Sequence, residues 1–150
     1  TKDGMALDIF VFQNSRGKAI QTQRRLDRIK SSLTLLLEGK VRPEILLSKA
    51  HAQEKEAKPF RIPVSIRSDN SFDNFTLLEV TALDRIGLLF TITRELQYHG
   101  IQILTAKIAT YGERAVDVFY IRDLFGLKLP ERKIEIIKAR LREAIEGLNS

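Results

Sequence analysis

The sequence predicts an α+β fold in which a small antiparallel sheet is covered by two helices. Between residues 61 and 150, strand-like and helix-like hydrophobic periods follow each other in the order strand, strand, helix, strand, strand, helix. Short segments of turn-forming residues separate these elements. The hydrophobic fraction of 43% over 150 residues is sufficient for a packed core.

The N-terminal part contains one strand and one helix. Residues Ala6–Phe12 are apolar and rich in β-forming types, so we expect a strand there. From Thr22 to Leu37 apolar residues recur at helical spacing, and Gly39 is placed to end that helix. One strand and one helix cannot form a core alone. We therefore expect this part to dock on another unit or on a second chain.

Residues 40–60 have the composition of a linker, in which Pro43 can start a helix. The segment Arg61–Arg67 alternates apolar and polar residues, and Pro63 predicts that it is an edge strand. The segment Phe75–Ala82 is apolar on both faces and is predicted to be a central strand. We expect these two strands to pair as an antiparallel hairpin.

The C-terminal part continues with a helix at about Ile86–Tyr98 and a pair of strands, Ile101–Thr110 and Ala115–Arg122. A last helix, Glu131–Leu148, has a regular apolar stripe. The loop before it contains Phe125, which is expected either to pack on a partner or to fill a gap within the domain.

From Phe75 onward the order of elements is that of a ferredoxin-like βαββαβ unit without its last strand. In that fold the last strand lies antiparallel beside the first. The strand at residues 61–67 can occupy this position through a simple hairpin, so we predict a complete four-stranded sheet. A backbone ladder between residues 61–67 and 75–82 would support the prediction.

A short repeat links the two parts of the chain. The segment Ala6–Phe10 reads ALDIF, and Ala115–Phe119 reads AVDVF. Asp8 and Asp117 therefore occupy the same place in their strands. Because successive residues of a strand point to opposite faces, we expect both carboxylates on the solvent face of a half-buried sheet.

Composition limits the function classes. The net charge is +6, of which +5 lies within residues 1–59. No aromatic residues are interleaved with these basic side chains, so a solvated surface is favoured over a nucleic-acid site. The chain has no cysteine, which excludes disulfides and thiolate chemistry and fits a cytoplasmic location. His51 and His99 are far apart in the sequence, and no metal site is expected.

The stretch Thr81–Leu89, TALDRIGLL, joins the predicted central strand to the next helix. A helix start presents free N–H groups and the positive end of the helix dipole, which suit a small carboxylate. Gly87 has no Cβ to obstruct a ligand. Asp84 is placed either to cap the helix or to meet a cation.

The string TALDRIGLLFTITREL, followed by TAKIATYGERAVDVFYIRDLFGLKL, resembles an ACT domain, the small-molecule-sensing module of metabolic enzymes. More particularly, the chain is similar to the C-terminal ACT-domain region of the bifunctional uridylyltransferase/uridylyl-removing enzyme acting on the PII nitrogen-regulatory protein. On this resemblance residues 1–39 are the C-terminal half of a first ACT unit, residues 40–60 a linker and residues 61–150 a second ACT domain.

The resemblance implies that this region senses glutamine and controls the attachment of UMP to PII and its removal. The residues that match the family's ligand turn are Asp84, Arg85, Ile86, Gly87, Leu88 and Leu89. The α-carboxylate is expected on N–H groups of Ile86–Leu88, and the α-ammonium on Asp84 or backbone carbonyls. Ile86 stands where the family usually has proline, which would preset the first helical turn.

No catalytic motif is present, so this region is not expected to be an enzyme or to hold a cofactor. The parent enzyme implied by the resemblance is a nucleotidyltransferase and UMP-removing hydrolase that uses magnesium. Its catalytic domains, PII and a second copy of the chain, through dimerisation or strand exchange, are the expected partners. An RNA-binding or protein-interaction module of the same topology, or a small enzyme, remains an alternative.

Overall fold

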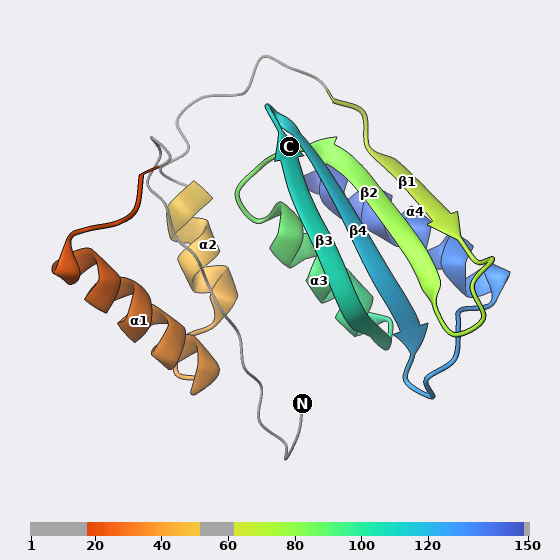
Figure 1. The fold of residues 1–150 in the computed structure, drawn as a ribbon, viewed down its shortest axis with the longest axis horizontal. Helices are drawn as coiled ribbons and strands as arrows, with labels where there is room; N and C mark the ends of the chain where they lie inside the picture. Colours follow the sequence, from red (N-terminus) through yellow and green to blue (C-terminus); the bar gives the residue numbers. More distant parts are fainter. Residues whose placement is uncertain (1–17, 52–61, 149–150) are drawn as a thin grey trace. The chain divides into compact units, whose positions relative to one another are not determined.

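The computed structural model describes residues 18–51 and 62–148 (Figure 1). The chain divides into two compact units, Thr1–Lys49 and Ala50–Ser150. The predicted strand Ala6–Phe12, which includes Asp8, lies outside the described residues, as do residues 52–60 of the predicted linker.

In the first unit, helix α1 spans Gln23–Leu37 and ends as predicted. Gly39 has a φ of 67°, and its N–H donates to the Leu36 carbonyl at 3.0 Å. The N–H of Lys40 donates to the Leu35 carbonyl at 2.9 Å, which completes a Schellman motif. A second helix, α2, begins at Pro43 and spans Pro43–His51, inside the predicted linker.

The second unit is built on a four-stranded antiparallel sheet. Its strands are β1 (Ser65–Asp69), β2 (Thr76–Leu83), β3 (Ile101–Tyr111) and β4 (Arg114–Asp123). They lie in the order β1-β2-β4-β3, so β1 and β3 are the edges (Figure 1). The predicted α+β class and the ferredoxin-like arrangement are confirmed.

Strand β1 occupies the position that the fourth strand takes in a βαββαβ unit. It pairs antiparallel with β2, from Ser65 opposite Thr81 to Asp69 opposite Leu77. The predicted ladder is therefore present, but the strand spans Ser65–Asp69 rather than residues 61–67. Pro63 has no N–H to donate, so it cannot contribute a donor to the ladder, and regular pairing begins beyond it.

Two helices, α3 (Leu88–Tyr98) and α4 (Glu131–Gly147), cover one face of this sheet (Figure 1). The buried residues of β2 and β4 alternate along each strand and face these helices. The core consists mainly of aliphatic side chains from all four elements, among them Leu78, Val80, Phe119, Ile121, Ile92, Leu96, Ile137 and Leu141. The predicted apolar stripe of the last helix contributes Ile134, Ile137, Leu141 and Ile145 to this core, and Leu148 packs against it.

The loop between β4 and α4 separates its apolar residues into two groups. Leu129 is buried, and its N–H donates to the hydroxyl of Thr76 at 3.0 Å. That hydroxyl in turn donates to Oδ1 of Asn70 at 2.8 Å. Phe125, by contrast, is 88% exposed. Phe125 therefore does not fill a gap within the domain, and its packing on a partner stays a prediction.

The expected position of Asp117 is wrong. Asp117 is 2% exposed and lies on the helix-covered face of β4, not on the solvent face. Ala115 and Phe119 share this face with it, and both are buried. The alternation of the strand is as predicted, but the carboxylate belongs to the buried set of residues.

Candidate ligand-binding corner

The chain turns sharply between β2 and α3, and hydrogen bonds fix both ends of the turn. The N–H of Asp84 donates to the Glu113 carbonyl at 2.8 Å, which ties the turn to the β3–β4 hairpin. The N–H of Leu88 donates to the Arg85 carbonyl at 3.2 Å. Between them, Gly87 has φ 84° and ψ −3°. These angles are those of the third residue of a type II turn, where glycine is required because φ is positive.

Ile86 is the second residue of this type II turn. Proline is common at that position because its fixed φ matches the turn. The resemblance to ACT domains implies a proline at the position of Ile86. Such a proline would preset the β-turn. The expectation that it would preset the first helical turn is wrong, because α3 begins only at Leu88.

Gly87 is the N-cap residue of α3, and no side chain caps this helix. Asp84 is therefore not the helix cap, and the helix begins two residues later than predicted. The first helical hydrogen bond runs from the N–H of Thr91 to the Gly87 carbonyl at 2.8 Å. Among the backbone hydrogen bonds of the turn and the helix cap in the described part of the chain, none comes from the N–H groups of Leu89 and Phe90.

These two N–H groups are the donors that the corner offers to an anion. The N–H of Leu88, which was expected to take part, is already used within the turn. The positive end of the dipole of α3 lies at the same place, so a carboxylate there gains from both hydrogen bonds and helix dipole.

The predicted ligand residues therefore have different roles in the fold. Arg85 donates from Nη1 to the Leu148 carbonyl at the end of α4, at 3.2 Å, while its Nε is buried without a partner. Leu88 is buried in the core. Ile86 and Leu89 are exposed at the rim of the turn. The structure thus brings the six residues to one corner, but only some of them face solvent.

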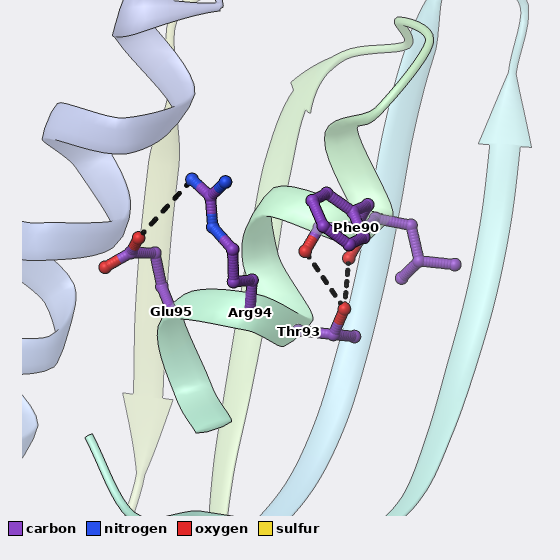
Figure 2. Close-up of polar contacts among 5 residues, drawn as sticks. Phe90, Thr93, Arg94 and Glu95 are labelled. Atoms are coloured by element: carbon purple, nitrogen blue, oxygen red, sulfur yellow. Dashed lines mark hydrogen bonds and ion pairs between the residues drawn. The ribbon is translucent and has the colours of Figure 1, made fainter. Parts of the chain in front are cut away.

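The outer side of α3 is organised separately from these donors (Figure 2). The guanidinium of Arg94 lies over the ring of Phe90, 5.5 Å from its centroid, and 3.8 Å from Oε1 of Glu95. The hydroxyl of Thr93 donates to the carbonyls of Leu89 and Phe90 at 2.9 and 3.1 Å. These contacts use carbonyls and side chains, so they leave the first-turn N–H groups available.

Asp117 is the functional candidate that sequence reasoning missed. Burial raises the pKa of its carboxyl above the usual value of 3.8, a hydrogen bond from the Ala109 N–H lowers it, and the nearby charge of Asp84 raises it. Its Oδ1 is buried and has no hydrogen-bond partner. One signal in the sequence could have found it: Arg114, Tyr120 and Arg122 share the opposite strand face, which marks that face as the exposed one.

The open face of the sheet carries a shallow pocket and an aromatic cluster. The pocket, of about 360 Å³, is lined by Ile62, Pro63, Ser65, Arg67, Glu79, Thr81, Arg114 and Val116. In the cluster, Phe75 stacks on Phe72 and meets Tyr120 edge-on, with centroid distances of 4.6 and 5.3 Å. Lys107 lies over the Tyr120 ring. Because these rings pack against one another, little of their surface is free to stack on nucleic-acid bases.

Within residues 18–51 and 62–148, no group of three or more histidine, cysteine, aspartate or glutamate residues is placed to hold a metal ion. In the same part of the chain, no helix combines the length and apolar character needed to span a bilayer.

The chain is similar to bifunctional uridylyltransferase/uridylyl-removing enzymes over nearly its whole length. It is 40% identical to the enzyme of that name from Cereibacter sphaeroides over 147 residues, which is 97% of this chain. The identity is 38% with the Azospirillum brasilense enzyme, over 95% of this chain, and 37% with that of Gluconobacter oxydans. The chain spans only about 16% of the length of these relatives.

Other comparisons add no second assignment. No family model matches the chain. No solved structure matches it either. The chain therefore resembles one part of a much larger uridylyltransferase/uridylyl-removing enzyme.

Proposed function

We propose that this chain is an amino-acid-sensing regulatory region of a uridylyltransferase/uridylyl-removing enzyme and that its effector is glutamine. The observation that carries the proposal is the corner between β2 and α3. There, a glycine-dependent turn leaves the Leu89 and Phe90 N–H groups without a backbone acceptor in the turn, at a helix start. Similarity to enzymes of that name over 95–97% of the chain supports the choice of parent enzyme.

The α-carboxylate of the effector would accept hydrogen bonds from the N–H groups of Leu89 and Phe90. Both donors belong to the first turn of α3, so their positions are set by the packing of Leu88 and Ile92 in the core. A preformed donor pair of this kind loses little conformational freedom when it binds. The exposed rim residues Ile86 and Leu89 would contact the remainder of the ligand.

Arg85 offers a physical route from this corner to the end of α4. Its side chain reaches from the turn to the Leu148 carbonyl, so a change in the turn also changes the support of the last helix. Coupling between an effector and a distant catalytic site is typically about 1–3 kcal/mol, or roughly 5- to 150-fold in affinity. Rearrangement of the hydrogen bond between Arg85 and Leu148 would contribute to a coupling free energy of this size.

In the parent enzyme, effector binding would shift the balance between attaching UMP to PII and removing it. The catalytic domains that perform these reactions, with their magnesium, would lie in the much larger remainder of the enzyme. PII would contact those domains as substrate. The chain itself would act as a binding region and not as a catalyst.

Isothermal titration calorimetry of the 150-residue chain with L-glutamine tests the proposal. We expect saturable heat at millimolar glutamine, and weaker binding in Gly87→Ala, since a Cβ at this φ distorts the turn. Gly39→Ala, at a φ of 67° in the first unit, is the control for backbone strain away from the corner. Absence of binding by a folded chain would contradict the proposal.

The nucleic-acid alternative is tested with the same protein. Binding of single-stranded oligonucleotides is measured at several salt concentrations, because phosphate contacts make affinity fall steeply as salt rises. The proposed function predicts no specific binding. A strong, salt-dependent affinity that is lost in Tyr120→Ala would instead favour the aromatic face of the sheet.

A further inference from the structure

The pocket on the open face of the sheet contains three charged side chains without partners. Its volume is about 360 Å³, and small-molecule sites in proteins occupy roughly 300–1,000 Å³. Arg67 of β1, Glu79 of β2 and Arg114 of β4 all line it. Within residues 18–51 and 62–148, none of the ion pairs includes any of these three side chains, and none of the side-chain hydrogen bonds does. The pocket therefore has both the size and the free charges of a binding site.

The register of the strands orders the polar groups along the pocket. Arg67 lies directly opposite Glu79, and two residues along the same strands Ser65 lies directly opposite Thr81. One level beyond Thr81, the pairing of β2 with β4 places Arg114. All five residues alternate with buried residues of the core, so their side chains belong to the open face. The pocket thus has an Arg114 end, two hydroxyls in its middle and an Arg67–Glu79 end.

The Arg114 end of the pocket suits a phosphate group. A guanidinium presents a planar fork of donors that matches phosphate oxygens. The hydroxyls of Ser65 and Thr81, at the next level, can each donate one further hydrogen bond. A phosphate monoester has three acceptor oxygens and a charge of about −1.5 to −2 at pH 7. Glu79 is the one acidic side chain that lines the pocket, and it lies at the other end.

The other end of the pocket suits neutral hydroxyl groups. The charges of Arg67 and Glu79 cancel, and the two side chains offer a donor and an acceptor next to each other. Sugar hydroxyls both donate and accept, and a carboxylate that accepts from ribose hydroxyls is used in dinucleotide-binding folds. A polynucleotide fits less well, because Glu79 would repel the next phosphate of the strand.

We propose that this pocket binds a sugar phosphate. Arg114, Ser65 and Thr81 bind the phosphate, and Arg67 and Glu79 bind the hydroxyls of the sugar. The inference goes beyond the proposed function, because the amino-acid corner lies at the first turn of α3 whereas this pocket lies on the face of the sheet that the helices leave open. The chain thereby has sites for two chemical classes of small molecule.

The test is calorimetric titration of the 150-residue chain and three variants with ribose 5-phosphate, inorganic phosphate and ribose at one ionic strength. Arg114→Gln removes the cation at the phosphate end, and Glu79→Ala removes the acceptor at the sugar end. Arg122→Gln is the matched control, since Arg122 lies on the same face of β4 but does not line the pocket. Thermal unfolding shows that each variant is folded. Amide ¹H–¹⁵N shifts locate the bound ligand.

We expect the parent chain and Arg122→Gln to bind ribose 5-phosphate alike, at least about tenfold more tightly than inorganic phosphate, and to show no saturable heat with ribose. Loss of a charge-assisted hydrogen bond should weaken binding of ribose 5-phosphate to Arg114→Gln by about tenfold or more. In Glu79→Ala the preference for ribose 5-phosphate over inorganic phosphate should disappear. The amides of Ser65 and Thr81 should shift on binding.

Four results would overturn the proposal. The first is that the folded parent chain does not bind ribose 5-phosphate. The second is that inorganic phosphate binds as tightly, which would leave no role for the sugar. The third is that Arg114→Gln and Arg122→Gln weaken binding equally, which would show a general effect of charge. The fourth is that the largest shifts occur at Leu89 and Phe90, which would place the phosphate at the start of α3. The L-glutamine titration is a separate measurement, so the proposed function can fail or stand independently.

Discussion

Replacing Gly87 by alanine tests the geometry of the corner. Gly87 has a φ of 84°, in the left-handed region, where a Cβ costs roughly 1–2 kcal/mol. We expect the free energy of unfolding of the second unit to fall by about this amount. For a domain of this size, that loss corresponds to a decrease in Tm of roughly 5–15 °C. Urea denaturation followed by far-UV circular dichroism measures the first quantity, and a thermal scan measures the second.

Two other glycines make the result interpretable. Gly112 has a φ of 63° and open space around an added Cβ, so Gly112→Ala should lose a similar amount through backbone strain alone. Gly147 lies in α4 and likewise has space, so Gly147→Ala should be neutral or should stabilise the helix by up to about 1 kcal/mol. If Gly87→Ala behaves like Gly147→Ala, the type II turn described above is wrong.

Three further predictions concern the rest of the second unit. Thr76→Val should lower the free energy of unfolding by about 1–3 kcal/mol in urea denaturation, because the Leu129 N–H loses its buried acceptor. The pKa of Asp117 is raised in the folded chain. The carboxyl therefore contributes fully to the free energy of unfolding below the unfolded pKa of about 3.8, and this contribution is lost as pH rises through the folded pKa. The stability of Asp117→Asn relative to the parent should therefore increase with pH over that window in denaturation series, and a pH-independent difference would contradict the assignment. Phe125→Ser should change Tm by less than about 2 °C, because the side chain is 88% exposed; a large loss would show that the ring packs within the domain.

Most of the fold follows from local patterns in the sequence. The alternating and helical apolar periods predict the strands and helices of the second unit, since these elements bury one face each. The pairing of β1 with β2 follows because a short loop, residues 70–75, joins them. Pro63 delays the start of β1, an effect that depends on where the ladder places each N–H. The alternation of apolar and polar residues alone therefore does not predict the first residue of β1.

The corner was less predictable because it depends on dihedral angles. Ile86 and Gly87 fit a helix start and a type II turn equally well by residue type, and only the positive φ decides between them. That choice moves the free donors from Ile86–Leu88 to Leu89 and Phe90. Asp117 was misplaced for a different reason. Both faces of β4 carry apolar residues, so polarity alone assigned the carboxylate to solvent.

The most direct test of the central claim, that the first turn of α3 binds an amino-acid carboxylate, is an NMR titration. Amide ¹H–¹⁵N shifts of the 150-residue chain are followed as L-glutamine is added. The amides of Leu89 and Phe90, which have no backbone acceptor in the described turn, should move most and should saturate with one affinity. Saturable binding that leaves these two amides unmoved would contradict the claim, as would the absence of any shift at millimolar glutamine.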